Sequence, residues 1–345
     1  MEKLVSNWYN VQPVPEDYVF PPQIRPGSVR VPIGESFPVI DLSEAEKGDR
    51  TLTMQKILKA AHEFGFFQVH DITSILVINH GIPNNLINET MSVLKEFFQL
   101  PAEAKQHLEG SGMKDFRFIR NSVTYAAENV HIWRDCLKHP CHPLERWQHM
   151  WPQAPARYQE CVGACSVEVK KLGSRILSLI SEGLGLDGEY LEGEYSQTMT
   201  LSANFYPTCP EPDLTLGVPK HADPNIITLL LQDGVYGLQV LKDDTWIGVD
   251  ANPHAIVVNI ASQMQVISNS NLKSAEHRAV TNSSEARISA AFFICASEES
   301  IVEPAKALID ELHPPIYKSF KSKDFLSKFQ ATFGDSQATL EFFKA

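Results

Sequence analysis

The fold is decided by six short β-rich runs, which are TLSANFYP (200–207), NIITLLLQD (225–233), LQVLKDDTWIGVD (238–250), AIVVNIA (255–261), EHRAVTN (276–282) and RISAAFFICAS (287–297). Turn residues separate the runs, and Asp243-Asp244 stands where a hairpin turn would. Strands at this regular spacing, without helices between them, indicate an antiparallel sandwich or barrel rather than a parallel sheet. We therefore expect a mainly β fold with a double-stranded β-helix, or jelly-roll, core.

Amphipathic segments on both sides of this stretch predict a helical support layer. Apolar residues recur at helical spacing in 52–65, 85–98, 156–184 and 322–333. The first 38 residues are rich in proline and lack such periodicity, so we expect an irregular arm that adds packing rather than chemistry.

We expect four parts along the chain. They are an N-terminal helical and mixed region (1–150), a long support helix (151–195), the jelly-roll core (196–300) and a C-terminal helical tail (301–345).

Composition excludes several classes of protein. The 345 residues carry a formal charge of −12 with a pI near 5.5, whereas sequence-independent nucleic-acid binding requires a basic footprint. We find no export signal and no apolar run long enough to span a membrane, so we expect a cytoplasmic protein without a membrane or nucleic-acid partner.

The six cysteines are scattered without CxxC pairs, which favours reduced, structural thiols.

The candidate chemistry begins at His221-Ala222-Asp223. In an extended segment, residues two apart point to the same face, so this pair presents an imidazole and a carboxylate to one point. His277, in SAEHRAV, is the natural third ligand. Two histidines and one carboxylate on one face leave the opposite coordination positions open, as in non-haem iron(II) oxygenases.

A second pair follows ten residues after His277. Alternation along a strand places Arg287 and Ser289 on one face. A guanidinium can bind the distal carboxylate of a dicarboxylate in a bidentate manner, and a neighbouring hydroxyl can donate another hydrogen bond. Each motif is weak alone, but together they predict an iron site with an anchor for an acidic co-substrate.

The motifs together resemble the plant 2-oxoglutarate- and iron(II)-dependent dioxygenases. The resemblance covers nearly the whole chain, including FPVIDL from Phe37, FGFFQV, INHGIP, WRDCLKHPCHPLE, NFYPTCPEPDLTLG, HADPNIITLLLQD, GLQVLKDDTWIGV, VVNI, HRAV and RISAAFF. It implies iron(II), 2-oxoglutarate and O₂ as cofactor and co-substrates, with ascorbate as a possible support. It also implies oxidative decarboxylation of 2-oxoglutarate to succinate and CO₂, coupled to oxidation of a small-molecule substrate by a monomeric enzyme.

The same resemblance implies further site residues. Iron ligands are His221, Asp223 and His277, and the co-substrate contacts are Arg287 and Ser289. Tyr206 would add a hydroxyl to the co-substrate site. Asn204 would orient the co-substrate or serve as a structural residue, and Phe293 would stack on an aromatic substrate or belong to the core.

Several blocks resemble the downy-mildew-resistance-type oxygenases, which are implicated in salicylic acid hydroxylation and plant defence. They are also similar to flavone synthases, flavanone 3-hydroxylases and hyoscyamine 6-hydroxylase. We therefore expect an aromatic or phenolic plant metabolite as substrate, with salicylic acid or a flavonoid leading. The ligand set does not separate hydroxylation from desaturation or ring closure.

Two departures from the family pattern stand out. HDITSILV (His70 to Val77) separates FGFFQV from INHGIP, and we interpret it as either a bulged loop or an exon-junction artefact, favouring the second. His70 and Asp71 are not expected to be ligands. Ala261-Ser262 replaces the usual Gly-Asp, a change that threatens a turn or packing more than the chemistry.

Three alternatives remain open at this point. The chain could be an alkaloid hydroxylase of the hyoscyamine 6-hydroxylase type, or a catalytically impaired member of the fold that only binds a metabolite. A closed structural zinc site would need a fourth ligand and would leave the Arg287 and Ser289 pair without a purpose.

Overall fold

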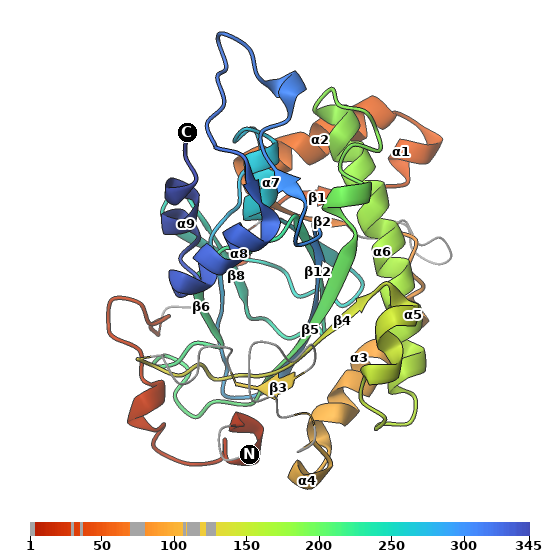
Figure 1. Ribbon diagram of the computed structural model, residues 1–345. Coiled ribbons are helices and arrows are strands. Elements are labelled where there is room, and N and C mark those ends of the chain that lie inside the picture. The colour runs from red at the N-terminus through yellow and green to blue at the C-terminus, as the bar shows by residue number, and fades with distance from the viewer. Residues whose placement is uncertain are drawn as a thin grey trace.

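Two facing β-sheets form the centre of the protein, which is seen here as a computed structural model (Figure 1). The structure describes residues 4–28, 31–34, 37–69, 80–105, 108, 118–121 and 129–345. Among them, the larger sheet has the order β1 (Val39–Ile40), β2 (Phe66–Val69), β10 (Ile256–Ile260), β7 (Ile227–Gln232), β12 (Arg287–Cys295), β5 (Thr198–Tyr206), β4 (Asp135–His142), β3 (Phe118–Arg120). The smaller sheet has the order β6 (Val218–His221), β11 (His277–Ala279), β8 (Leu238–Lys242), β9 (Thr245–Gly248).

The strand pairing confirms the predicted jelly-roll core. Neighbouring strands of both sheets run antiparallel, apart from β1 and β2, which run parallel. The hairpin between β8 and β9 turns at Asp243 and Asp244, whose φ angles are 48° and 58°. Two successive positive φ values are typical of a type I′ turn, which matches the twist of the flanking strands.

Four helices lie where the apolar periodicity predicts them, with boundaries shifted by a few residues. They are α2 (Arg50–Glu63), α3 (Asn84–Gln99), α6 (Tyr158–Gly183) and α8 (Ser322–Ala331). The described residues also form helices that the pattern did not predict, which are α1 (Glu44–Lys47), α4 (Ala102–Lys105), α5 (Leu144–Trp147), α7 (Ser262–Ile267) and α9 (Ser336–Phe342). Short 3₁₀ turns occur at Val5–Asn7, Glu16–Tyr18, Gln148–Met150, Gly193–Tyr195 and Lys306–Leu308. A small third sheet pairs β13 (Ile301–Val302) with β14 (Phe320–Lys321).

Helices α2, α3 and α6 cover one face of the larger sheet (Figure 1). Strand β12 shows why, because Ile288, Ala290, Phe292 and Ile294 alternate towards these helices and are fully or almost fully buried. Gly173 lets α6 approach the sheet, since a Cβ at this position would collide with the Ile294 side chain. The opposite face of β12 is left free to line the space between the two sheets.

The N-terminal arm packs on the sheet as expected. Both carboxylate oxygens of buried Asp135 accept hydrogen bonds from the arm, from the backbone N–H of Val5 at 2.8 Å and of Ser6 at 2.9 Å. Tyr18 and Trp133 add an edge-to-face ring contact at 5.7 Å. Asp135 therefore fastens the arm to β4.

Other expectations concern parts of the chain that the structure leaves undescribed. The inserted segment His70 to Val77, including His70 and Asp71, lies outside the described residues. The division into four parts stays a prediction. In the part of the chain that the structure describes, no helix combines the length and the apolar character needed to cross a membrane.

Candidate metal and co-substrate site

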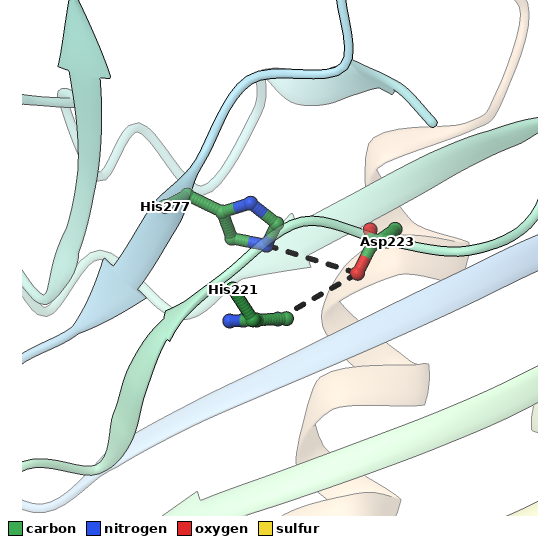
Figure 2. Close-up of side chains that lie close together, drawn as sticks. All are labelled: His221, Asp223 and His277. Atoms are coloured by element: carbon green, nitrogen blue, oxygen red, sulfur yellow. Dashed lines mark ion pairs between the residues drawn. The ribbon is translucent and has the colours of Figure 1, made fainter. Parts of the chain in front are cut away.

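Three predicted ligands meet between the two sheets. His221 ends β6, Asp223 lies two residues later in the following loop, and His277 begins β11, where it pairs with His221 across the strands. One ligand atom from each lies within 4.8 Å of the others. Figure 2 shows the three side chains pointing towards one another, with Asp223 Oδ1 3.6 Å from His221 Nε2 and 3.8 Å from His277 Nε2.

Backbone carbonyls fix which nitrogen of each imidazole faces this point. His221 Nδ1 lies 2.9 Å from the carbonyl oxygen of Pro219, and His277 Nδ1 lies 3.3 Å from that of Ala275. A carbonyl oxygen only accepts, so each Nδ1 carries the proton and donates it. Both Nε2 atoms are thereby left with lone pairs directed at the carboxylate, which is the tautomer that a metal requires.

Two residues without a predicted role hold the carboxylate in place. Asp223 Oδ2 accepts hydrogen bonds from Thr228 Oγ1 at 2.7 Å and Asn259 Nδ2 at 2.6 Å. Thr228 and Asn259 are cross-strand partners on β7 and β10, so the sheet register sets both donors. Because Oδ2 is occupied, Oδ1 is the oxygen that faces the two imidazoles.

Burial keeps the first histidine neutral. Loss of solvent, together with the neighbouring His277, lowers the pKa of His221 to about 4, although Asp223 acts in the opposite direction. A neutral imidazole at pH 7 can bind a metal without first losing a proton. Two imidazoles and one carboxylate are the donor set expected for iron(II) with open positions, so these residues fit the metal that the sequence implies.

The predicted anchor lies across the same space. Arg287 is 3% exposed, donates from Nε to the Val235 carbonyl at 3.1 Å and from Nη2 to Gln232 Oε1 at 2.8 Å, and forms no ion pair among the described residues. Its guanidinium lies 5.0 Å from the ring centroid of Tyr206. A Cβ at Gly237 would collide with the Arg287 side chain, so glycine there makes room for it. A buried cation whose hydrogen bonds go to neutral groups fits a carboxylate ligand.

A cavity of about 90 Å³ joins the two ends of the site. Its lining includes all the predicted site residues, which are His221, Asp223, His277, Arg287, Ser289, Tyr206, Asn204 and Phe293. Arg287 pairs with Tyr206 and Ser289 with Asn204 across β12 and β5, so these four side chains share the inner face of the larger sheet. No hydrogen bond joins the hydroxyl of Tyr206 or Ser289 to another described residue.

Asn204 and Phe293 differ in how they face this cavity. Asn204 Oδ1 accepts a hydrogen bond from Arg134 Nη1 at 3.1 Å, and Asn204 Nδ2 donates to the Ser202 carbonyl at 3.0 Å. This arrangement favours the structural role that the sequence left open for it. Phe293 is only partly buried and lines the cavity, whereas its neighbour Phe292 is fully buried in the core.

The Ala261-Ser262 departure leaves the metal loop supported. Ala261 has φ −102°, a conformation open to any residue, and precedes α7. The Ser262 backbone N–H donates to the Asp223 carbonyl at 2.8 Å, and its hydroxyl lies 3.2 Å from that of Ser274. The change therefore alters the first turn of α7 without removing the backbone hydrogen bond to the Asp223 loop.

Comparisons with known proteins agree with this geometry. Residues 197–296 match the 2OG-Fe(II) oxygenase superfamily, and residues 37–154 match the N-terminal family described as "non-haem dioxygenase in morphine synthesis N-terminal". Protein DOWNY MILDEW RESISTANCE 6 of Arabidopsis thaliana is 40% identical over 99% of this chain and 98% of its own length. Flavanone 3-dioxygenase 2 of Oryza sativa subsp. japonica is 39% identical over 96% of this chain and 94% of its own length.

A solved structure extends the similarity to the fold. The crystal structure of JOX2 in complex with 2OG, Fe and JA superposes with a TM-score of 0.84 at 31% sequence identity. The match covers 97% of this chain and 95% of that one.

Proposed function

This chain belongs to the 2OG-Fe(II) oxygenase superfamily, and from that premise we propose that it oxidises a small aromatic or phenolic metabolite. It is a 2-oxoglutarate-dependent dioxygenase, and the family implies iron(II) and 2-oxoglutarate. The proposal assigns the iron to His221, Asp223 and His277. The observation that carries it is the convergence of these three ligand atoms in one cavity with the buried Arg287, which forms no ion pair with a described residue.

We assign the residues of this chain the following tasks. Arg287 binds the distal carboxylate of 2-oxoglutarate, and the hydroxyls of Ser289 and Tyr206 donate hydrogen bonds to it. Thr228 and Asn259 orient Asp223 so that one oxygen remains for the metal. Iron(II), 2-oxoglutarate and O₂ supply the oxidising chemistry, with succinate and CO₂ as co-products.

Apolar residues supply the rest of the cavity wall. Phe66 lies edge-on to His277 at 5.1 Å, and Leu230, Val257 and Phe293 also line the cavity. These side chains exclude water around the reacting centre and give an aromatic substrate a surface to pack against. Phe293 is the residue that we propose to contact the substrate ring.

Salicylic acid or a flavonoid is the proposed substrate. The name of one relative, flavanone 3-dioxygenase 2, supports a flavonoid, and salicylic acid rests on the sequence resemblance to the downy-mildew-resistance-type oxygenases. An alkaloid hydroxylase of the hyoscyamine 6-hydroxylase type is the second candidate from the resemblance. Desaturation instead of hydroxylation, support by ascorbate, a monomeric state, a cytoplasmic location and a role in plant defence remain proposals from the sequence.

Substrate-stimulated co-substrate turnover tests the proposed function. The protein is purified anaerobically, supplied with iron(II), and assayed for 2-oxoglutarate-dependent succinate release with a panel of phenolic acids and flavanones. Release stimulated by one panel member supports the proposal. No release despite bound iron would instead favour a catalytically impaired member that only binds a metabolite.

A further inference from the structure

A strip of three residues begins at Arg134, which precedes β4 and lines the cavity, and continues along one face of β4. Arg134, Cys136 and Lys138 alternate along the strand and therefore share one face. Cys136 pairs with Asn204 and Lys138 with Ser202 on β5, whose side chains line the cavity. Arg134 therefore reaches the cavity from a different segment of the chain than the proposed anchor Arg287.

Contacts confirm that the strip points inwards. Arg134 lines the cavity and donates from Nη1 to Asn204 Oδ1 at 3.1 Å, while Cys136 Sγ lies 3.0 Å from Ser202 Oγ. Lys138 Nζ lies 5.6 Å from the ring centroid of Phe293, the proposed aromatic contact. The Lys138 ammonium group and the Phe293 ring thus lie close together beside the cavity.

Both cations lack the partners that such groups usually have. Arg134 is partly buried and its Nε, which is shielded from solvent, has no hydrogen-bond partner. Neither Arg134 nor Lys138 forms an ion pair with any described residue, in a chain whose formal charge is −12. A guanidinium offers five N–H donors, so most of the hydrogen-bonding capacity of Arg134 is unused.

The proposed cofactors and their ligands need neither of these two residues for charge balance. With the proposed cofactors bound, the charges of iron(II), the 2-oxoglutarate dianion, Asp223 and Arg287 cancel. Arg278, the other arginine of the lining, donates to Gln239 at 2.7 Å and stacks on Trp246 at 4.0 Å. Because Gln239 and Trp246 engage the guanidinium of Arg278, Arg134 and Lys138 are the cations that we assign to the substrate.

We propose that Arg134 and Lys138 select a substrate that is itself an anion, an aromatic acid whose carboxylate meets Arg134 while its ring lies against Phe293. This inference rests on the proposed function and narrows it, because a neutral flavanone would leave Arg134 without an ionic partner. Ser202 and Ala291, both small, lie between the strip and Phe293 on the sheet and leave room for one ring.

A pair of matched probes tests the selection. The compounds 2-hydroxybenzoate and 2-hydroxybenzamide share ring and phenol but differ in charge, and a neutral flavanone serves as the third probe. Equilibrium binding is measured anaerobically on protein supplied with iron(II) and 2-oxoglutarate, and succinate release is measured separately. Wild-type protein is expected to bind the benzoate at least about 10-fold more tightly than the benzamide.

Single substitutions test which residues cause the preference for the benzoate over the benzamide. Arg134→Gln should weaken benzoate binding roughly 10- to 100-fold and change benzamide binding by less than about 3-fold. Lys138→Gln should act in the same direction but less strongly, because Lys138 is only partly buried and does not itself line the cavity. Arg134→Lys keeps the charge and should restore part of the preference. The control Lys59→Gln removes an equal charge from exposed α2 and should change neither affinity.

Several results would overturn the inference. One is that wild-type protein binds the benzoate and the benzamide equally tightly. Another is that Arg134→Gln weakens the binding of both compounds equally. A third is that the only effect of Arg134→Gln is a raised 2-oxoglutarate requirement. Turnover of the neutral flavanone by wild type that is as efficient as turnover of the benzoate would also refute it, while leaving the oxygenase function intact. If Arg134→Gln fails to fold, Arg134→Lys and Lys138→Gln carry the same comparison.

Discussion

Removing one hydrogen-bond donor to Asp223 should weaken iron(II) binding without removing a metal ligand. Thr228→Val replaces a hydroxyl by a methyl group of similar shape and deletes the 2.7 Å hydrogen bond to Asp223 Oδ2. Asn259 would then be the remaining donor to this oxygen, and the carboxylate could rotate away from the two imidazoles.

The magnitude follows from the charge on the acceptor. A hydrogen bond to an ionised group contributes about 1.5 to 3 kcal/mol, and about 1.4 kcal/mol corresponds to a factor of 10 in an equilibrium constant. We therefore expect iron(II) to bind Thr228→Val roughly 10- to 100-fold more weakly, which agrees with the usual effect of losing a residue that orients a metal ligand.

The assay is an anaerobic titration with iron(II) in competition with a chelator. Thr281→Val is the matched control, because it deletes a buried hydroxyl contact of similar length, 2.9 Å to Thr215, away from Asp223. Unchanged iron affinity in Thr228→Val, or an equal loss in both variants, would refute the role given to Thr228.

Two further predictions concern the co-substrate and the pH dependence of stability. Arg287→Ala should raise the 2-oxoglutarate concentration needed for half-maximal succinate release far more than it changes substrate affinity, and an unchanged requirement would exclude Arg287 as the anchor. Burial lowers the pKa of His139 to about 4, below the ordinary value of 6.5, so the unfolded state binds a proton first as the pH falls. Stability should therefore drop between pH 6.5 and 4, by about 2 kcal/mol from this group at pH 5, and urea unfolding of wild type and His139→Gln at pH 7 and 5 should differ in that sense.

Sequence pattern was enough to predict which residues the structure brings together at the candidate site. His221 and Asp223 are separated by one residue, and Arg287 and Ser289 likewise, so local geometry alone constrains each pair. His277 required only that a third ligand come from a neighbouring strand. The structure differs in detail, because Asp223 lies in the loop after β6 rather than within a strand.

Residues whose contacts depend on strand register could not be found from the sequence pattern. Thr228 and Asn259 lie 31 positions apart in the sequence and become neighbours through the pairing of β7 with β10. Arg134 belongs to a block that signalled only family resemblance, and its place beside Asn204 follows from the pairing of β4 with β5. A single sequence contains the donors but does not state which strands lie side by side.

The central claim is that His221, Asp223 and His277 together hold one iron(II). The most direct test is the number of iron(II) ions bound per chain, measured anaerobically in wild-type protein and in the three single alanine variants, with unfolding midpoints recorded as a check on folding. We predict one equivalent in wild type and a strong loss in each folded variant. One equivalent retained by all three variants would contradict the claim.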